Sequence, residues 1–246
     1  MSEVETDPRV SCPIVCGEYM RATGFFYESG KQVYLITARH NVLPTNEDKL
    51  KTGRMEMDYT TTDFLPTIDI YLQGVADTAV ETVDIRHTDG TTSLAGIDII
   101  AVPVEFNPRE FGYVVWSADD VAGPDSATET LESIGFNGDS LPSSDLPYNK
   151  ELYRQSKITP RTLSIMNNDL NLVVPCGLAD WGFEVERYGN SGANNGFSGS
   201  PVLGNDLLGV HGVTMTPYES DFEELELEPC NLIIYWPATI LPKLLD

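Results

Sequence analysis

Three side chains that lie far apart in the chain could together carry out acyl transfer. Ser198 stands in a turn-like Gly-Phe-Ser-Gly-Ser-Pro segment, His40 follows an apolar run, and Asp98 precedes one. A serine hydroxyl is a poor nucleophile unless a base takes its proton, and a histidine can do so near neutral pH. A carboxylate can hold that histidine in the required tautomer. The chain therefore supplies His, Asp and Ser in one of the orders that nucleophilic triads use.

The turn around Ser198 has the composition that a reactive serine requires. Gly196 and Gly199 flank it, and glycine permits positive φ and close approach of a substrate. The amides of Gly196 and Ser198 are candidates for the two donors of an oxyanion hole. A second interpretation stays open, in which the turn is a hairpin rich in serine and glycine, and His40 and Asp98 are hydrogen-bonded residues with no chemical role.

Short β-strands are expected to position these residues, because apolar segments of strand length alternate with turn signals and helical periodicity is almost missing. His40 would follow a strand over residues 31–38, and Asp98 would open one over residues 97–103. Ser29-Gly30 has the composition of a hairpin turn. A segment rich in Pro, Gly and acidic residues could join two halves. The other expected elements are strands over residues 9–17, 22–28, 55–60, 69–72, 82–87, 130–135, 153–165, 171–174, 182–186, 200–203, 207–215 and 231–236, the joining segment 107–127, and a short helix within residues 237–245.

The ordered motifs resemble those of the chymotrypsin-like serine peptidases, including their bacterial and archaeal trypsin-like domains. Residues 37–40 resemble the family's Thr-Ala-x-His, residues 98–102 its Asp-Ile-Ala-Leu element, and residues 196–201 its Gly-Asp-Ser-Gly-Gly-Pro. The three matches come in the family's order and span most of the chain. The Gly-x-Ser-x-Gly motif of α/β-hydrolases fits less well, because Ser200 replaces its second glycine and the partners follow in another order.

This resemblance implies an all-β fold of two antiparallel, six-stranded Greek-key β-barrels with the active site between them. Residues 1–112 would form the N-terminal barrel with His40 and Asp98, and residues 113–246 the C-terminal barrel with Ser198. Ser198 would be the nucleophile, His40 the base and Asp98 the residue that orients it. The implied activity is that of a serine endopeptidase working through an acyl-enzyme. The alternatives are a catalytically silent binding module of the same fold and an unrelated β-rich protein.

The resemblance also implies a pocket for the P1 side chain of the substrate, the residue before the scissile bond. No aspartate stands at Gly192, six residues before Ser198, where trypsin carries the one that selects Lys or Arg. His211 is similar to the histidine that contacts an acidic P1 side chain in glutamyl endopeptidases, so we expect a preference for Glu, Gln or a small apolar residue. A core histidine bonded to backbone is the alternative. The expected lining is Gly192, Ala193, His211, Gly212, Val213 and Thr214.

Phe197 departs from the pancreatic-type pattern, in which an aspartate before the nucleophile pairs with a newly cut N-terminus. That ion pair cannot form with phenylalanine, so no proteolytic maturation is expected. Ser200 in place of the second glycine is similar to the form that glutamyl endopeptidases carry.

The overall charge is strongly negative, because 38 acidic residues face 15 basic ones and leave a net charge of −23. Such a protein repels phosphates, so a protein or peptide substrate is expected and nucleic acid is not. No cofactor and no metal are expected. Two interpretations of the charge stay open: adaptation to a salt-rich cytosol, and an acidic protein of an ordinary bacterium.

The sequence also bears on compartment. The first residues are acidic and lack a basic segment followed by an apolar one, and no run approaches the roughly 18 apolar residues of a membrane span. We therefore expect a cytoplasmic protein that does not bind membranes, while the sequence does not indicate an oligomeric state. Reduced thiols are the simplest expectation for Cys12, Cys16, Cys176 and Cys230.

Overall fold

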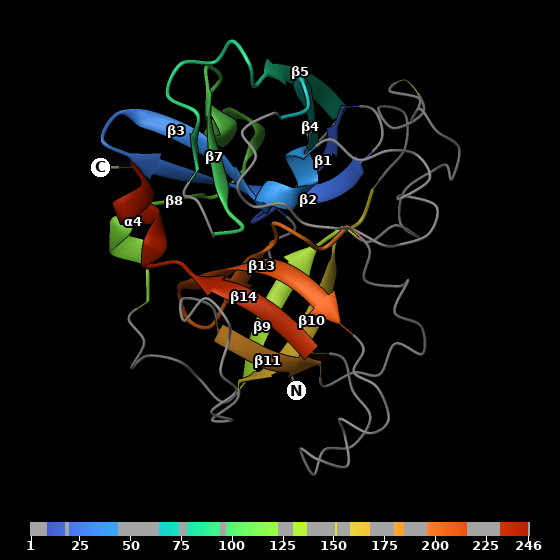
Figure 1. Ribbon diagram of the computed structural model, residues 1–246, viewed down its shortest axis with the longest axis vertical. Coiled ribbons are helices and arrows are strands. Elements are labelled where there is room, and N and C mark those ends of the chain that lie inside the picture. The colour runs from blue at the N-terminus through green and yellow to red at the C-terminus, as the bar shows by residue number, and fades with distance from the viewer. Residues whose placement is uncertain are drawn as a thin grey trace.

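The chain folds into two β-rich halves, one above the other in Figure 1. The computed structural model describes residues 9–17, 20–43, 64–73, 78–93, 97–122, 130–136, 151, 158–167, 180–184, 196–215 and 232–245. Within these ranges, no helix has the length and apolar character that crossing a membrane would require.

The N-terminal half is an eight-stranded sheet. Its strands are β1 (Cys12–Cys16), β2 (Met20–Ser29), β3 (Gln32–Thr37), β4 (Thr67–Gln73), β5 (Thr78–Asp84), β6 (Thr92–Ser93), β7 (Ile100–Val104) and β8 (Val115–Trp116). Seven of them follow the order β5-β4-β1-β2-β3-β7-β6 in antiparallel pairs, and β8 pairs in parallel with β2. The sheet curls around its own apolar side chains.

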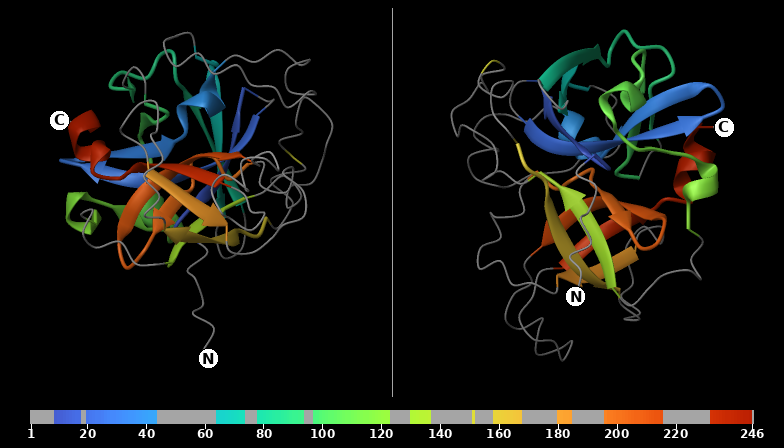
Figure 2. Two further views of the ribbon diagram at one scale, coloured as in Figure 1. Left: turned by 60° about the horizontal axis from the view of Figure 1, so that its bottom comes forward. Right: turned by 180° about the vertical axis from the view of Figure 1, so that it is seen from behind.

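The C-terminal half is a closed barrel of six strands, seen from behind in the right view of Figure 2. Its strands are β9 (Thr130–Gly135), β10 (Arg161–Asn167), β11 (Asp180–Glu184), β12 (Pro201–Leu203), β13 (Leu207–Met215) and β14 (Leu232–Pro237). They follow the order β10-β11-β14-β13-β12-β9, and β9 also pairs with β10. Closure leaves no free strand edge in this barrel. Helix α4 (Ile240–Leu245) follows β14.

Strand β2 shows why the N-terminal sheet can be buried on both faces. Successive side chains of a strand point to opposite faces. Phe26 packs in the core of the N-terminal half, while Phe25 and Tyr27 pack between the halves. At the end of β2, Gly30 has φ 62 in the two-residue turn to β3, a conformation that glycine adopts without strain. The hairpin predicted at Ser29-Gly30 is confirmed.

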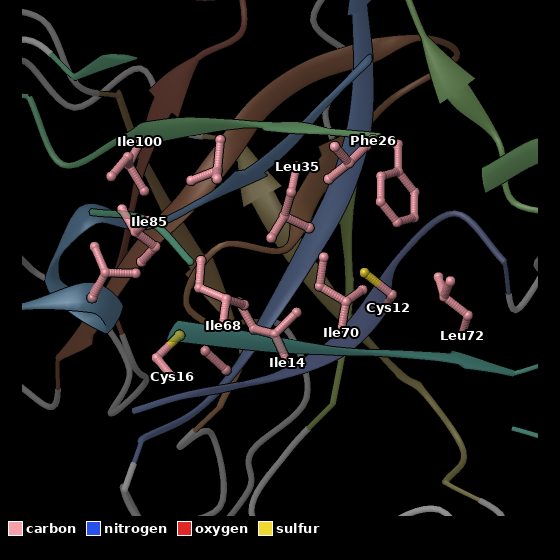
Figure 3. Close-up of a cluster of buried hydrophobic side chains, with 14 of the residues drawn as sticks. Cys12, Ile14, Cys16, Phe26, Leu35, Ile68, Ile70, Leu72, Ile85 and Ile100 are labelled. Carbon is pink, nitrogen blue, oxygen red and sulfur yellow. The ribbon is translucent and has the colours of Figure 1, made fainter. Parts of the chain in front are cut away.

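The core of the N-terminal half is made of branched aliphatic and aromatic side chains (Figure 3). Ile14, Leu35 and Ile70 are fully buried there. Cys12 and Cys16 belong to the same cluster and are free thiols. Burial raises the pKa of both thiols, which keeps them protonated and unreactive. The reduced state predicted for these two cysteines is therefore confirmed, and the other two lie outside the described residues.

A second apolar cluster joins the two halves, and we call it the shared core. From the N-terminal half it contains Phe25, Tyr27, Ile36, Ile97, Ile99 and Ala101, and from the C-terminal half Leu207, Val210, Trp236, Ala238, Ile240, Leu241 and Leu244. The last three residues are the inner face of α4, which lies against the N-terminal sheet in Figures 1 and 2. Burying one such side chain contributes about 1.5–3 kcal/mol, so the two halves are held together by apolar contact.

The predicted all-β fold of two barrel-like halves is confirmed, with one correction: the N-terminal half is an eight-stranded curled sheet that includes the parallel pair β2–β8, and not a six-stranded antiparallel barrel. Further differences lie at the element ends. β5 ends at Asp84 instead of residue 87, because the Asp84 carboxylate accepts the amide of Arg86 at 3.1 Å and bonds the His87 ring at 2.8 Å, which closes a turn. β10 begins at Arg161 instead of residue 153. Strands predicted over residues 55–60 and 171–174 lie outside the described residues. The predicted boundary at residues 112 and 113 stays a prediction, although β8 beyond it pairs with β2.

In its described part, residues 107–122, the predicted joining segment contains three short elements. They are the 3₁₀ turn η2 (Pro108–Phe111), strand β8 and the 3₁₀ turn η3 (Ala118–Asp120). The Asn107 side chain accepts the Arg109 amide at the start of η2, and Gly112 ends it with φ 77. These caps turn the chain toward β2 before it enters the second barrel.

Candidate active site

His40 lies in a short 3₁₀ turn, η1 (Arg39–Val42), which begins two residues after β3. The Arg39 amide donates to the Asp98 carbonyl at 3.2 Å, so η1 is tied to the segment that leads into β7. The apolar run of β3 is paired with β7. Two adjacent strands thus deliver His40 and Asp98 to the same end of the sheet.

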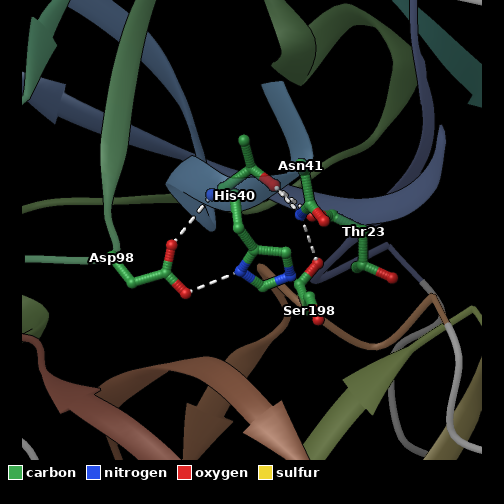
Figure 4. A network of polar contacts seen from close by, with 6 residues as sticks. Thr23, His40, Asn41, Asp98 and Ser198 are labelled. Carbon is green, nitrogen blue, oxygen red and sulfur yellow. Dashed lines mark hydrogen bonds and ion pairs between the residues drawn. The ribbon is translucent and has the colours of Figure 1, made fainter. Parts of the chain in front are cut away.

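Both carboxylate oxygens of Asp98 bind His40 (Figure 4). Oδ2 lies 2.6 Å from the ring Nδ1, and Oδ1 accepts the backbone amide at 2.8 Å. Asp98 is 1% exposed and His40 4%. Because a carboxylate can only accept, the hydrogen of the neutral imidazole is on Nδ1 and the lone pair is on Nε2. This arrangement presents a base on the far side of the ring from Asp98.

Ser198 lies on that far side, with the imidazole between it and Asp98 in Figure 4. It is half-buried, on a turn whose glycines Gly196 and Gly199 have φ 103 and 91. In the described part of the chain, no hydrogen bond joins the Ser198 hydroxyl to Nε2 of His40. Such bonds are often long in free enzymes and tighten when the substrate binds.

The turn that carries Ser198 is held by hydrogen bonds from the residues that follow Ser198. The Phe197 carbonyl accepts the Ser200 amide at 2.9 Å and the Ser200 hydroxyl at 2.5 Å. The Gly199 amide donates to the His211 carbonyl at 2.7 Å. Neither the Gly196 nor the Ser198 amide donates to a described acceptor. Their role as an oxyanion hole stays a prediction.

Three polar residues that the sequence did not indicate as functional contact this turn from the N-terminal half. Thr23 donates from Oγ1 to the Gly196 carbonyl at 2.7 Å and from its amide to the Ser198 carbonyl at 3.2 Å. Asn41 also donates to the Ser198 carbonyl, at 3.0 Å, and Thr37 bonds both Thr23 and Asn41. Thr37 is the first residue of the His40 motif and Asn41 follows the motif directly, whereas Thr23 has no local signal.

His211 differs from the charged residue that an acidic P1 side chain would need. It is 0% exposed, and its ring bonds two hydroxyls, Ser133 through Nδ1 and Thr214 through Nε2, each at 2.9 Å. Burial, helped by the charge of His40, lowers the pKa of His211 to about 3. Its ring is therefore neutral near pH 7, and its contact with a P1 side chain stays a prediction. The ring partners are also side chains and not backbone.

The other residues expected to line the P1 pocket divide into two groups. Gly192 and Ala193 lie outside the described residues. Gly212 is buried, and Val213 and Thr214 are half-buried on β13 beyond an irregularity in its pairing with β14. Their contact with a substrate stays a prediction.

Phe197 contributes to the core of the C-terminal barrel. Its side chain is 1% exposed and clusters with Leu163 and Val202. Its ring centroid lies 6.0 Å from that of His211. An apolar site of this kind has no place for the ion pair that activates pancreatic-type enzymes.

Gly199 is a position where an added methyl group should destabilise the protein strongly. A Cβ there would collide with the carbonyl of Thr23 and the hydroxyl of Thr37, and φ 91 is strained for an L-residue. We expect Gly199→Ala to lower the free energy of unfolding by about 3 kcal/mol or more. Gly30→Ala is the matched control, since Gly30 also has positive φ but nothing within 4 Å of the added Cβ. Equal losses for the two variants in urea unfolding would contradict this account.

Comparisons with known proteins identify the fold. No family model and no curated protein matches the chain. Among solved structures, the HtrA-type protease AlgW is similar over 98% of this chain, with a TM-score of 0.50 and 11% identity, and the chain spans only 60% of its length. A Glu endopeptidase is similar over 96% of this chain and 89% of its own, with a TM-score of 0.53 and 14% identity. Human heparin binding protein is similar over 94% of this chain and 88% of its own, with a TM-score of 0.50 and 10% identity.

These likenesses define a class by its fold. The protein has the trypsin fold, two β-barrels with a candidate site at their junction. Within that class, the similar structures include both proteins called proteases and one named for binding heparin. The fold alone therefore does not decide the activity.

Proposed function

We propose that this protein is a serine endopeptidase in which Ser198, His40 and Asp98 form a catalytic triad. The observation that carries the proposal is the buried His40–Asp98 pair, in which both carboxylate oxygens are engaged and the free ring nitrogen is on the side of Ser198. The similarity to protease structures supports the same class of reaction.

The proposed reaction proceeds in two stages. Ser198 Oγ attacks the peptide carbonyl carbon while Nε2 of His40 takes the hydroxyl proton, and Asp98 stabilises the imidazolium. The amides of Gly196 and Ser198 stabilise the oxyanion. His40 then gives its proton to the leaving amine, which leaves an acyl-enzyme. A water molecule, activated by the same histidine, hydrolyses the ester and restores Ser198.

A binding module of the same fold is the second candidate. Human heparin binding protein illustrates such a role by its name. The net charge of −23 opposes binding of a polyanion such as heparin. A binding module also has no need of a buried Asp98 whose two carboxylate oxygens both hold His40. These two observations favour the enzyme.

Labelling with a fluorophosphonate tests the proposal directly, because this probe phosphonylates a serine only when its hydroxyl is activated. Intact mass should increase by one adduct, and peptide mapping should locate it on Ser198. The matched control is Ser164→Ala, on β10 of the same barrel, which should label at the wild-type rate, whereas Ser198→Ala should not label. A folded wild-type protein that does not react would reject the enzyme and leave the binding module.

The state of His211 leads to a prediction about substrate preference. With no acidic residue at Gly192 and a neutral His211, we expect poor cleavage after Lys or Arg. We also expect the ratio of kcat/KM for matched P1 Glu and P1 Gln peptides to stay constant between pH 6 and 8, because the histidine has already lost its proton at these pH values. A ratio that falls as the pH rises through 6.5 would instead show a histidine that titrates against the Glu carboxylate. His211→Asn is the control, since the variant should have the same flat profile.

A further inference from the structure

We propose that Thr23 and Asn41 are positioning residues, which reach across from the N-terminal half and hold the nucleophile turn in its reactive conformation. This inference rests on the proposed function. It assigns a role in catalysis to side chains that touch neither the substrate nor the reacting atoms. Thr23 is on β2 and Asn41 on η1, so both belong to the half that carries His40 and Asp98.

Thr23 uses all its polar groups at the junction of the halves. Its hydroxyl donates to the Gly196 carbonyl at 2.7 Å and accepts the Phe136 amide at 3.0 Å. Because a hydroxyl has a single proton, the Phe136 bond forces that proton toward Gly196. The Thr23 amide donates to the Ser198 carbonyl at 3.2 Å, and its carbonyl accepts the Thr37 hydroxyl at 2.7 Å. The side chain is fully buried.

Asn41 closes the network on the other side. Its amide nitrogen has two hydrogens, and it donates to the Ser198 carbonyl and to the Thr37 hydroxyl, each at 3.0 Å. Thr37 in turn donates to Thr23. A ring of hydrogen bonds therefore runs from Thr23 through Thr37 and Asn41 to Ser198 and back to Thr23. Figure 4 shows its Asn41–Ser198 bond beside the His40 ring.

These hydrogen bonds fix the peptide groups before and after the one that carries the Ser198 amide, a proposed oxyanion donor. The carbonyl and the amide hydrogen of one peptide group point in opposite directions. Ser200 holds the Phe197 carbonyl, so the Ser198 amide must point the other way. Thr23 holds the peptide group between residues 196 and 197 through the Gly196 carbonyl. Thr23 and Asn41 together hold the peptide group between residues 198 and 199 through the Ser198 carbonyl.

Gly196 is the place where this support matters most. Its φ of 103 lies in a region that glycine enters and leaves easily, so the peptide that follows it could rotate. Loss of the Thr23 hydroxyl frees the Gly196 carbonyl, and rotation there moves the Ser198 amide. An oxyanion donor that is not preorganised loses its effect on the transition state and has little effect on substrate binding. The expected signature is therefore a fall in kcat with KM nearly unchanged.

A purely structural role makes a different prediction. The shared core already joins the two halves, so a network that only added stability would lower the melting temperature and leave the chemistry of the folded protein unchanged. The split between kcat and KM separates the two roles. Thr82, on β5 of the N-terminal half, offers a control. Its hydroxyl donates to Asp69 at 2.6 Å in a partly buried hydrogen bond that does not involve the turn carrying Ser198.

The experiment compares Thr23→Val, Thr23→Ser and Thr82→Val as purified full-length proteins. We expect Thr23→Val to lower kcat and the fluorophosphonate labelling rate about tenfold or more, with KM within about threefold of wild type. Thr23→Ser, which keeps the hydroxyl, should recover most of the rate, and Thr82→Val should have the wild-type kcat. Should Thr23→Val not fold, Asn41→Leu at similar volume provides the same comparison.

The outcomes distinguish this inference from the function on which it rests. Wild-type protein that neither labels nor cleaves peptides overturns both. Active wild type together with a folded Thr23→Val whose kcat is within about twofold of it overturns the positioning role alone, and the same applies to a folded Asn41→Leu. A loss in Thr23→Val that Thr23→Ser does not recover also overturns it, because the hydroxyl would then not be the group responsible.

Discussion

Replacement of Ser198 by alanine is expected to remove the peptidase activity while the protein stays folded. Ser198 is half-buried, and in the described part of the chain its hydroxyl makes no hydrogen bond, so its loss should change the melting temperature little. Without the nucleophile no acyl-enzyme forms, and kcat should fall by about 10⁵–10⁶, with a residual rate from the rest of the site. The measurement is kcat/KM on a peptide that the wild type cleaves.

The control for this prediction is again Ser164→Ala, which removes a serine hydroxyl from the same barrel. It should retain wild-type kcat/KM. Ser198→Ala protein with a normal melting temperature and a comparable kcat/KM would remove Ser198 from the mechanism. The binding module would then be the better account of the fold.

Asp98→Asn is expected to produce the second large loss, about 10⁴ in kcat. The asparagine oxygen can still accept the His40 amide, as Oδ1 does now at 2.8 Å. Its NH₂ group would then face Nδ1 of the ring, where the carboxylate accepts at 2.6 Å. Two donors cannot pair, so the imidazole changes to the tautomer with its hydrogen on Nε2. That tautomer presents a hydrogen to Ser198 in place of a lone pair.

Asp69→Asn controls for the loss of a buried carboxylate. Asp69 is also 1% exposed and lies on β4 of the same half. Its replacement should change stability only, so kcat should be that of the wild type. A fall in kcat of less than tenfold for Asp98→Asn, or an equal fall for the two variants, would contradict the role given to Asp98.

The elements of the fold could be predicted because their signals are local. Apolar segments of strand length indicated β2 and β13, and Ser29-Gly30 marked the hairpin between β2 and β3. The ends of β5 and β10 were harder to predict from the sequence. Asp84 ends β5 by bonding residues two and three positions later, and a side chain that competes with the strand ladder in this way is not visible in the hydrophobic pattern.

The candidate site likewise contains residues with local sequence signals and residues whose role depends on distant contacts. His40, Asp98 and Ser198 each stand in a short motif, and the order of the three motifs along the chain made them recognisable. Thr23 and Asn41 contact residues 173 and 157 positions away, and no window of the sequence contains both partners. The charge state of His211 was also hidden, because its pKa is lowered by burial within the closed barrel and by the charge of His40, which is far away in the sequence.

The shared core also bears on when the proposed enzyme can first act during translation. Synthesis proceeds from the N-terminus, and domains generally fold as they emerge from the ribosome. His40 and Asp98 belong to the half that is synthesised first, whereas Ile240, Leu241 and Leu244 contribute to the shared core from the element that follows the second barrel. The proposed base is therefore in place before the second barrel can dock. The proposed site is complete only once the second barrel and α4 have also been synthesised and have packed against the N-terminal half.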